Sequence, residues 1–273
     1  MEVSRVGVLG AIVAHKREEL TARRRRVPLE DIRRRAADAP PARGFAAAIQ
    51  GPPVRLIAEV KGASPSAGVI RETFDPAAVA RTYAEHGAAA VSVLTDARFF
   101  HGADEHLAMV RRAVPVPVLR KDFTLDPYQV YEARTLAADA VLLIAAILDA
   151  GALRDLQGLA AELGMAALVE VHSEDELRRA LAARPAVLGI NNRNLDTLET
   201  TLETTRRLRP LVPAGPRIVA ESGIETRGHV EELERLRVDA VLVGTALMRS
   251  ADPAARVREL LGHPHARRAG TER

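Results

Sequence analysis

The sequence contains no cysteine, only three lysines, and no long apolar run. The absence of cysteine excludes disulfide bonds and thiolate metal sites, and it leaves the redox compartment undetermined. No apolar run approaches the roughly 18 to 20 residues of a membrane span, and the charged start of the chain lacks the pattern of a cleaved signal peptide. These absences predict a cytoplasmic protein that does not enter a membrane.

Acidic and basic residues nearly balance, with 36 Asp and Glu against 39 Lys and Arg and a net charge of +3. That balance gives no argument for a nucleic-acid partner. Arginine runs at residues 23–26 and 33–35 favour a solvated helix face over a phosphate or nucleic-acid patch. We therefore predict no nucleic-acid binding.

Lysine and asparagine are rare, and their positions are unusual. Lys16, Lys61 and Lys121 are the only lysines among 39 basic residues. Arginine does not lose its proton at accessible pH, so a lysine in such a background can mark a site that needs a titratable amine. All three asparagines fall between residues 191 and 194. Both features indicate residues kept for a catalytic or binding site.

Short apolar runs alternate with amphipathic stretches from Leu56 onward, and this pattern repeats eight times. The apolar runs lie at residues 56–60, 89–94, 116–120, 140–145, 166–171, 187–191, 217–221 and 240–244. Nearly continuous apolar strands are typical of a parallel sheet that is buried on both faces. Eight strand-helix units predict an α/β fold, the (β/α)8 or TIM barrel. A doubly wound open sheet is the alternative, but the first strand is not followed by a glycine-rich nucleotide fingerprint.

The residues before the first strand carry apolar positions at helical spacing, among them Val8, Leu9 and Ile12. They predict an N-terminal helical extension, residues 1–45, packed on the barrel. The barrel catalytic domain is predicted for residues 46–262. Residues 263–273 have no apolar pattern and are predicted to form a disordered tail.

Residues capable of chemistry gather where the predicted strands end, which is where barrels assemble their active sites. Glu59 and Lys61 are two apart and leave a strand on the same face, as a catalytic pair or as a buried structural ion pair. Glu170 lies on an otherwise apolar strand, so we expect a raised pKa and a role as general acid or base, the alternative being a structural glutamate at a strand end. Lys121 precedes Asp122, whose side chain should point the opposite way.

The segments after the last two strands, residues 221–224 and 243–246, are small and rich in backbone amides. Many barrels bind phosphate at this position. The loop 61–68 is also small and could close over a ligand, with Lys61 or Ser64 reaching the phosphate. These segments predict a phosphorylated small molecule as substrate. His101 and His106 lack persuasive metal spacing, so no metal site is predicted.

The segments IAEVKGASPSAGVI, LRKDFTLDPYQVYEAR, LVEVH, LGINNRNL, VAESGI and ADAVLVGTALM follow one another along the chain. Together they resemble the indole-3-glycerol-phosphate synthase family of tryptophan biosynthesis, over residues 5–262. The resemblance implies a lyase that cyclises 1-(2-carboxyphenylamino)-1-deoxyribulose 5-phosphate to indole-3-glycerol phosphate, with loss of carbon dioxide and water. It implies no cofactor, and it allows other tryptophan-pathway enzymes as partners.

The resemblance also implies roles for single residues. Lys121 would be the principal general acid, protonating the ribulose carbonyl oxygen, and Glu170 the matching acid-base carboxylate. Glu59 and Lys61 would form a second acid-base pair, and Asn191 would orient a ribulose hydroxyl. The implied substrate-binding residues are Arg193 for the carboxylate, Phe100 and Phe123 for the anthranilate ring, Glu221 and Ser222 in the pocket floor, and Ser64, Gly223, Gly244 and Thr245 for the phosphate.

Three other functions remain open at this point. The first is another phosphate-binding barrel, such as a phosphoribosyl isomerase or a tryptophan synthase α-like lyase. An isomerase of the phosphoribosylanthranilate type would need a Cys and Asp pair, and this chain has no cysteine. The second is a non-catalytic ligand-binding barrel, which has no use for so many buried titratable groups. The third is RNA binding by the basic leader, which lacks aromatic stacking residues near its arginines.

Overall fold

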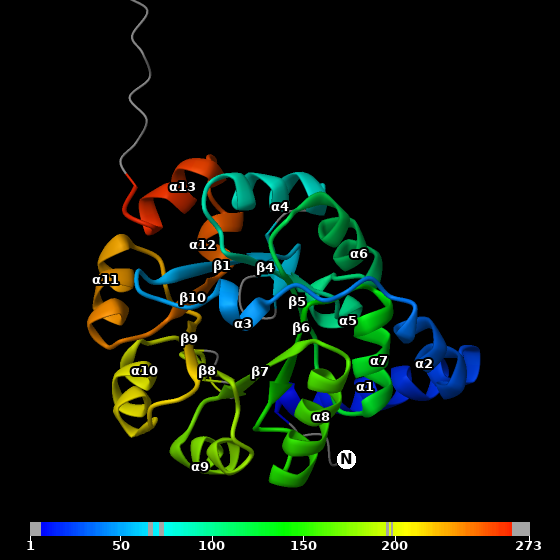
Figure 1. Ribbon diagram of the computed structural model, residues 1–273. Coiled ribbons are helices and arrows are strands. Elements are labelled where there is room, and N and C mark those ends of the chain that lie inside the picture. The colour runs from blue at the N-terminus through cyan, green and yellow to red at the C-terminus, as the bar shows by residue number, and fades with distance from the viewer. Residues whose placement is uncertain (1–6, 65–67, 71–73, 195–196, 198, 264–273) are drawn as a thin grey trace, which may run out of the picture.

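The computed structural model describes residues 7–64, 68–70, 74–194, 197 and 199–263. Eight parallel strands close into a barrel in which each strand pairs with the next along the chain and the last pairs with the first (Figure 1). The strands are β1 (Arg55–Val60), β4 (Ala90–Leu94), β5 (Val118–Lys121), β6 (Ala140–Ile144), β7 (Ala166–Val171), β8 (Val187–Asn191), β9 (Arg217–Glu221) and β10 (Ala240–Val243). The predicted (β/α)8 barrel is confirmed.

Helices surround this barrel on all sides in Figure 1. They are α4 (Pro76–Glu85), α6 (Asp104–Ala113), α7 (Pro127–Thr135), α8 (Ala150–Glu162), α9 (Glu174–Ala182), α10 (Glu203–Leu208), α11 (Arg227–Arg235) and α13 (Pro253–Leu260). Three of these helices are capped by an aspartate that directly precedes a proline: Asp75, Asp126 and Asp252. Each carboxylate accepts a backbone N–H from the first turn of its helix.

Several short elements lie in the loops, four of them after strands and one, a 3-10 turn, between α10 and β9. They are β2 (Ala63–Ser64), β3 (Gly68–Val69), α5 (Ala97–Phe100), α12 (Thr245–Met248) and the 3-10 turn η1 (Arg209–Leu211). The two-stranded β2-β3 sheet is antiparallel and was not predicted from the sequence. Each of its strands has only two residues, so neither produces a visible period in the sequence.

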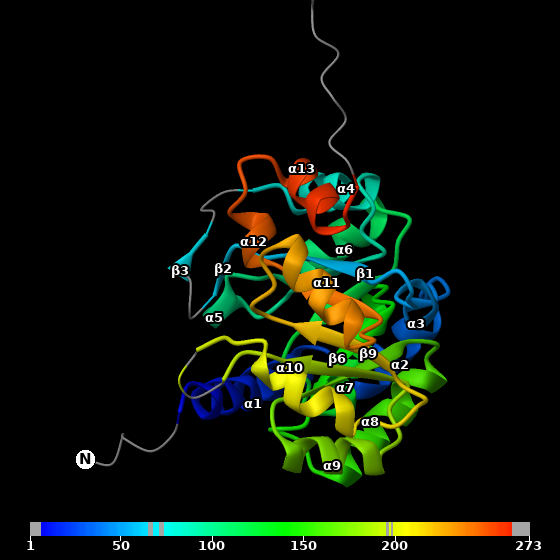
Figure 2. The ribbon, with the colours of Figure 1, turned by 90° about the vertical axis from the view of Figure 1, so that its left-hand side faces the viewer.

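Two apolar layers hold the fold together. One lies between the strands and the surrounding helices, and the other fills the barrel from its N-terminal end. Phe45 and Ile49, from α3 (Phe45–Ala48) and the residue that follows it, are fully buried in the second layer. Figure 2 shows α3 at the end of the barrel opposite α5 and α12. Apolar side chains therefore close one end of the barrel and leave the other for polar groups.

On β5 and β7 the inward face carries an apolar residue first and a charged residue two positions later. Leu119 is followed in this way by Lys121, and Leu168 by Glu170. Because side chains alternate along a strand, both members of each pair point into the barrel. The charged residues therefore form a charged level inside the barrel, next to the second apolar layer and nearer the C-terminal ends of the strands.

The N-terminal extension consists of α1 (Val8–Arg26) and α2 (Leu29–Ala37). Helix α1 lies beside the barrel, and its N-terminal end is on the side where β2, β3 and α5 lie (Figure 2). It buries Ile12, Lys16 and Leu20, which are spaced four residues apart on one helix face. Leu20 and Ile32 pack with Tyr128 of α7 in a separate apolar cluster. A row of buried side chains on one face of α1, one of them a lysine, thus packs the extension against the barrel.

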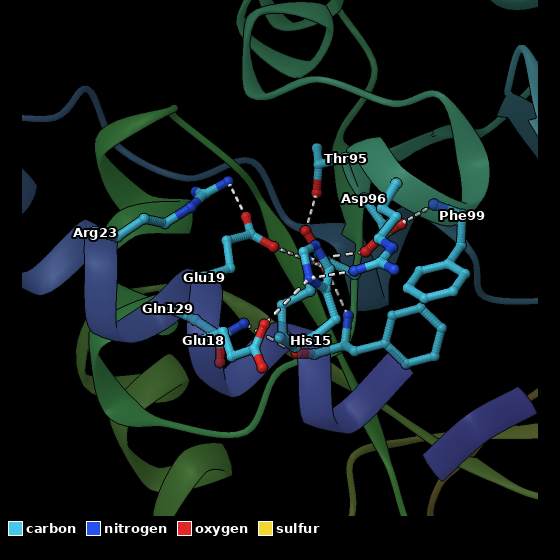
Figure 3. Close-up of polar contacts among 12 residues, drawn as sticks. His15, Glu18, Glu19, Arg23, Thr95, Asp96, Phe99 and Gln129 are labelled. Carbon is cyan, nitrogen blue, oxygen red and sulfur yellow. Dashed lines mark hydrogen bonds and ion pairs between the residues drawn. The ribbon is translucent and has the colours of Figure 1, made fainter. Parts of the chain in front are cut away.

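Lys16 is buried in an ion cluster between α1 and the barrel. Its Nζ lies 2.8 Å from Glu19, 3.0 Å from Asp96 and 2.9 Å from Asp122. Figure 3 shows Glu19, Thr95 and Asp96 converging on this point from α1 and from the loop after β4. Burial opposes the charge of Lys16, but the carboxylates outweigh it and raise its pKa. The expectation that this lysine marks a titratable amine is wrong, because its ammonium stays charged and serves as an anchor.

The limits of the domains predicted from the sequence, residues 1–45 and 46–262, stay predictions. Of the predicted tail, residues 264–273 lie outside the described part of the chain. None of the described helices is long and apolar enough to cross a membrane.

Candidate active site

A cavity of about 380 Å³ opens at the C-terminal ends of the strands. This volume is within the range of pockets that hold small metabolites. Its walls include Glu59, Lys61, Phe100, Lys121, Phe123, Glu170, Asn191, Arg193, Glu221, Ser222, Gly223, Gly244 and Thr245. These are all the site residues predicted from the sequence except Ser64. Ser64 lies in β2, and its side chain is outside what the structure describes.

Lys121 occupies the centre of the charged level. Its Nζ lies 3.0 Å from Glu170 Oε2 and is also hydrogen-bonded to Glu221 Oε2. Burial opposes the ammonium charge, but Glu170, Glu221 and Glu59 outweigh burial and raise the pKa of Lys121. Lys121 is therefore held as an ammonium at neutral pH, at the wall of the cavity. The Asp122 carboxylate contacts Thr95 and Lys16 and not the group around Lys121, as expected from strand alternation.

Glu170 and Glu221 lie on either side of Lys121 and differ in protonation. Burial raises the pKa of Glu170, but Lys121 and then His172 outweigh it and hold this pKa well below its usual range. The raised pKa expected for Glu170 is therefore wrong. Burial raises the pKa of Glu221, and the charge of Glu170 adds to the rise. One carboxylate thus stays ionised beside the ammonium while the other tends to hold a proton.

Glu59 and Lys61 form a second charged pair in the same cavity. Lys61 Nζ lies 2.7 Å from Glu59 Oε1, and both side chains are largely buried. A Cβ on Gly244 would lie only 2.3 Å from Glu59 Oε1 and 2.9 Å from Lys61 Nζ. Gly244 is therefore needed to make room for the pair. The two charged groups reach the cavity from β1 and the residue that follows it, two strands away from β5 and Lys121.

Two of the clustered asparagines, Asn191 and Asn192, have different roles. Asn191 lines the cavity, and its Oδ1 accepts the backbone N–H of Arg193 at 3.0 Å. Asn192 points away, where its Oδ1 accepts from the amide and hydroxyl of Thr205 and its Nδ2 donates to the Ser222 carbonyl. Asn192 therefore ties the loop after β8 to the turn after β9. Burial lowers the pKa of Arg193, an effect that Glu59 opposes.

An apolar wall faces the charged groups. Phe100 and Phe123 pack with ring centroids 6.0 Å apart, and both line the cavity. Val8, Leu9 and Ile12 of α1 line it as well, a role that the sequence analysis missed. The apolar face of the predicted N-terminal helix was the available signal. An aromatic ring can be held between this wall and the charged groups.

The turn after β9 and the start of α12 form the far side of the cavity. Ser222 and Gly223 both have positive φ, 66° and 74°, and a Cβ on Gly223 would meet the Thr200 side chain at 2.6 Å. Arg249 lines this side of the cavity four residues after Thr245, and the sequence analysis missed it too. Backbone amides together with an arginine suit a phosphate group.

The described residues offer no group of three His, Cys, Asp or Glu side chains that could hold a metal ion. A bound molecule would instead meet three acidic residues, Glu59, Glu170 and Glu221, and two lysines, Lys61 and Lys121. Such a set can donate and accept protons on several sides of one substrate.

Gly189 of β8 is a further residue of the site that the sequence analysis missed. A Cβ at this position would lie 2.2 Å from Glu221 Oε1 and 3.2 Å from the Leu168 side chain. We expect Gly189→Ala to displace the Glu221 carboxylate from Lys121 and to lower kcat about a hundredfold, the size of effect that a 1 Å misplacement can cause. Steady-state kinetics would measure this loss.

The matched control is Gly158→Ala in α8, where an added Cβ has no atom within 4 Å. Alanine is the better helix former by up to about 1 kcal/mol, so this variant should be at least as stable as the parent and equally active. Equal activity of both variants would contradict the role of Gly189.

Comparisons with known proteins identify relatives across nearly the whole chain. A family model described as indole-3-glycerol phosphate synthase matches residues 9–260. The indole-3-glycerol phosphate synthase of Roseiflexus castenholzii (strain DSM 13941 / HLO8) is 54% identical over 264 residues, covering 93% of this chain and 98% of that protein. The enzyme of the same name from Acidithiobacillus ferrooxidans (strain ATCC 53993 / BNL-5-31) is 50% identical over 258 residues, again covering 93% and 98%.

A likeness to solved structures supports the fold alone. The crystal structure of 3-hexulose-6-phosphate synthase from Salmonella typhimurium superposes with a TM-score of 0.61 at 18% identity, covering 77% of this chain and all of that one. The family match and the half-identical relatives, by contrast, extend over the barrel and over most of α1. The chain therefore belongs to the indole-3-glycerol phosphate synthase family.

Proposed function

We propose that the cavity converts 1-(2-carboxyphenylamino)-1-deoxyribulose 5-phosphate to indole-3-glycerol phosphate, releasing carbon dioxide and water. The protein is a carboxy-lyase of tryptophan biosynthesis by its family. The observation that carries the residue assignment is the ammonium of Lys121 held between Glu170 and Glu221 inside the cavity. The protonated lysine is a general acid in place before the substrate arrives.

Ring closure forms a bond between the aromatic carbon that bears the carboxylate and the carbonyl carbon of the ribulose chain. The carbonyl oxygen gains negative charge as this bond forms, and Lys121 donates a proton to it. Loss of carbon dioxide then restores the aromatic ring. Because a carboxylate leaves as neutral carbon dioxide, the overall reaction takes up one proton. A lysine kept charged by buried carboxylates can supply that proton.

Dehydration removes the new hydroxyl as water and one hydrogen from the neighbouring carbon. The leaving hydroxyl needs a proton, and the carbon must lose one, so the step needs an acid and a base. We assign this step to Glu59 and Lys61, which form a pair at 2.7 Å on the opposite wall from Glu170. The ionised Glu170 also serves as a proton acceptor within reach of Lys121. The proton given to the leaving hydroxyl and the proton taken from the neighbouring carbon balance, so dehydration needs no proton from outside the site.

Substrate binding uses the remaining walls. Phe100 and Phe123 hold the anthranilate ring, with the apolar face of α1 on the same side. Arg193 pairs with its carboxylate, and Asn191 orients a ribulose hydroxyl. The phosphate lies at Gly223, Gly244 and Thr245, where Arg249 adds a cation. The assignment of Ser64 to the phosphate rests on the sequence and its family resemblance alone.

The small-molecule substrate agrees with the family of the chain. A cytoplasmic location, association with other tryptophan-pathway enzymes and the lack of a nucleic-acid partner stay predictions from the sequence.

The test is turnover of the purified protein with the carboxyphenylamino-deoxyribulose phosphate, followed by the absorbance of the indole product. We expect one indole-3-glycerol phosphate and one carbon dioxide for each substrate consumed. A folded protein that binds the substrate without consuming it would contradict the enzyme function and favour a ligand-binding barrel.

A further inference from the structure

His172 lies directly behind Glu170, outside the residues that line the cavity. It follows the last residue of β7, and its side chain is only 9% exposed. Its Nε2 lies 3.2 Å from Glu170 Oε1, and its Nδ1 lies 3.0 Å from Glu176 Oε2. The imidazole therefore bridges a carboxylate of the site and a carboxylate of α9.

Glu176 is held rigidly by the first turn of α9. Its Oε2 accepts the backbone N–H of His172 at 2.8 Å, and its Oε1 accepts the Ser173 hydroxyl at 3.1 Å. Ser173 in turn accepts the backbone N–H of Glu176 at 3.3 Å. Ser173 thus caps α9, and the Ser-x-x-Glu spacing is that of a capping box, except that Glu176 accepts the backbone N–H of His172 instead of that of Ser173. Helix α9 thus fixes one side of the imidazole.

His172 Nδ1 is hydrogen-bonded to Glu176, and Nε2 lies within ion-pair distance of Glu170 without a directed hydrogen bond. A carboxylate beside each ring nitrogen favours the imidazolium. Burial opposes this charge, but Glu170 and Glu176 outweigh it and raise the pKa of His172 to about 10. Glu170 reaches the ring from β7 and Glu176 from α9, while Lys121 on β5 lies on the other oxygen of Glu170. The Glu170 carboxylate is therefore held between two cations.

This second cation explains why the two carboxylates around Lys121 differ. Glu221 shares Lys121 with Glu170, and its Oε1 is buried with no hydrogen-bond partner among the described residues. Glu170 has His172 on the corresponding oxygen. The ionised carboxylate is consequently the one that His172 touches.

We propose that His172 is a positioning residue of the reaction: its imidazolium, held by Glu176, keeps the Glu170 carboxylate ionised and directed at Lys121. The inference rests on the proposed function, because the task of Glu170 is proton transfer in that reaction. His172 itself does not touch the substrate.

The test compares the pH dependence of kcat/KM for the parent and for His172→Gln, which keeps a polar side chain and removes the charge. Loss of a cation beside a carboxylate raises the pKa of that carboxylate, typically by about 1 to 3 units. We expect the acidic limb of the variant to move to higher pH by an amount of this order, with kcat lowered and KM close to that of the parent. His263→Gln, an exposed histidine at the end of α13, should leave the profile unchanged.

Glu176→Gln provides a second variant in case His172→Gln does not fold. It keeps one acceptor oxygen for the start of α9, replaces the other by an amide donor, and removes the charge that holds His172 protonated. We expect His172 to lose its proton at lower pH, so that kcat/KM falls at the basic end of the profile. Unchanged profiles in the folded variants would overturn the inference, whatever their kcat.

Nitrogen-15 NMR of histidine-labelled protein separates this inference from the proposed function. The signal that disappears in His172→Gln belongs to His172, and we expect it to show both ring nitrogens protonated at pH 8. A neutral ring at pH 8 would overturn the inference even if the enzyme turns over. A charged ring in a parent that does not turn over would contradict the proposed function alone.

Discussion

Lys121→Ala is expected to lower kcat by about three orders of magnitude, within the range that general acid catalysis contributes. The variant removes the only cation that contacts both Glu170 and Glu221 among the described residues. Among the described residues, no ammonium then remains between Glu170 and Glu221 to protonate the carbonyl oxygen as the ring closes. Steady-state kinetics on the folded variant, together with a binding measurement, would separate this loss from a loss of substrate affinity.

Lys121→Arg is the matched control for this prediction. Arginine keeps a positive charge between the two carboxylates, but it does not release a proton at accessible pH. We therefore expect it to fold and to bind substrate while losing nearly as much kcat as Lys121→Ala. An arginine variant with kcat near that of the parent would mean that Lys121 provides charge rather than a proton.

Lys16→Met is expected to lower the free energy of unfolding by about 3 to 5 kcal/mol, the cost of removing one partner from a buried ion pair. Methionine leaves Asp96 and Asp122, both nearly inaccessible, without the ammonium that lies within 3.0 Å of each. Because Leu9 and Ile12 of α1 line the cavity, loosening this helix should also raise KM. Urea-induced unfolding at pH 7 would measure the loss of stability.

Arg24→Met on the same helix is the control. Arg24 pairs with Asp126, but its side chain is 45% exposed, so its removal should cost less than about 1 kcal/mol. Equal losses in the two variants would contradict the role of the Lys16 cluster.

The stability from this cluster also depends on pH. Burial raises the pKa of Asp122, but Arg120 and Lys16 outweigh burial and lower it to about 2. Because the folded pKa lies below the unfolded one of about 3.9, this stability is present above pH 4 and is lost as the pH falls toward 2. Between pH 4 and pH 2 the free energy of unfolding of the parent should therefore fall, and that of Lys16→Met should fall by less. The urea midpoint measured from pH 5 to pH 2 would test this difference.

The barrel was predictable because its strands are buried on both faces and read as apolar runs. The position of the site was predictable for a related reason. Once Leu119 and Leu168 fill the inside of the barrel, Lys121 and Glu170 two positions later must point into its open end. Two very short strands, β2 and β3, were not predictable, since two residues establish no period.

The protonation of the site was not predictable from one strand at a time. The apolar neighbours of Glu170 in sequence suggested a raised pKa, yet Lys121 comes from two strands away and His172 follows on the same strand. The histidine and the Ser-x-x-Glu pattern were visible in the sequence, but only the structure brings both ring nitrogens to carboxylates. Likewise, the burial of Lys16 depends on Asp96 and Asp122, from two different loops.

The most direct test of the central claim is a single-turnover reaction with the protein in excess over the carboxyphenylamino-deoxyribulose phosphate. Carbon dioxide and indole-3-glycerol phosphate should appear in equal amounts and account for all the substrate, at a rate no slower than kcat. Substrate that is bound and recovered unchanged, or carbon dioxide released without an indole product, would contradict the claim.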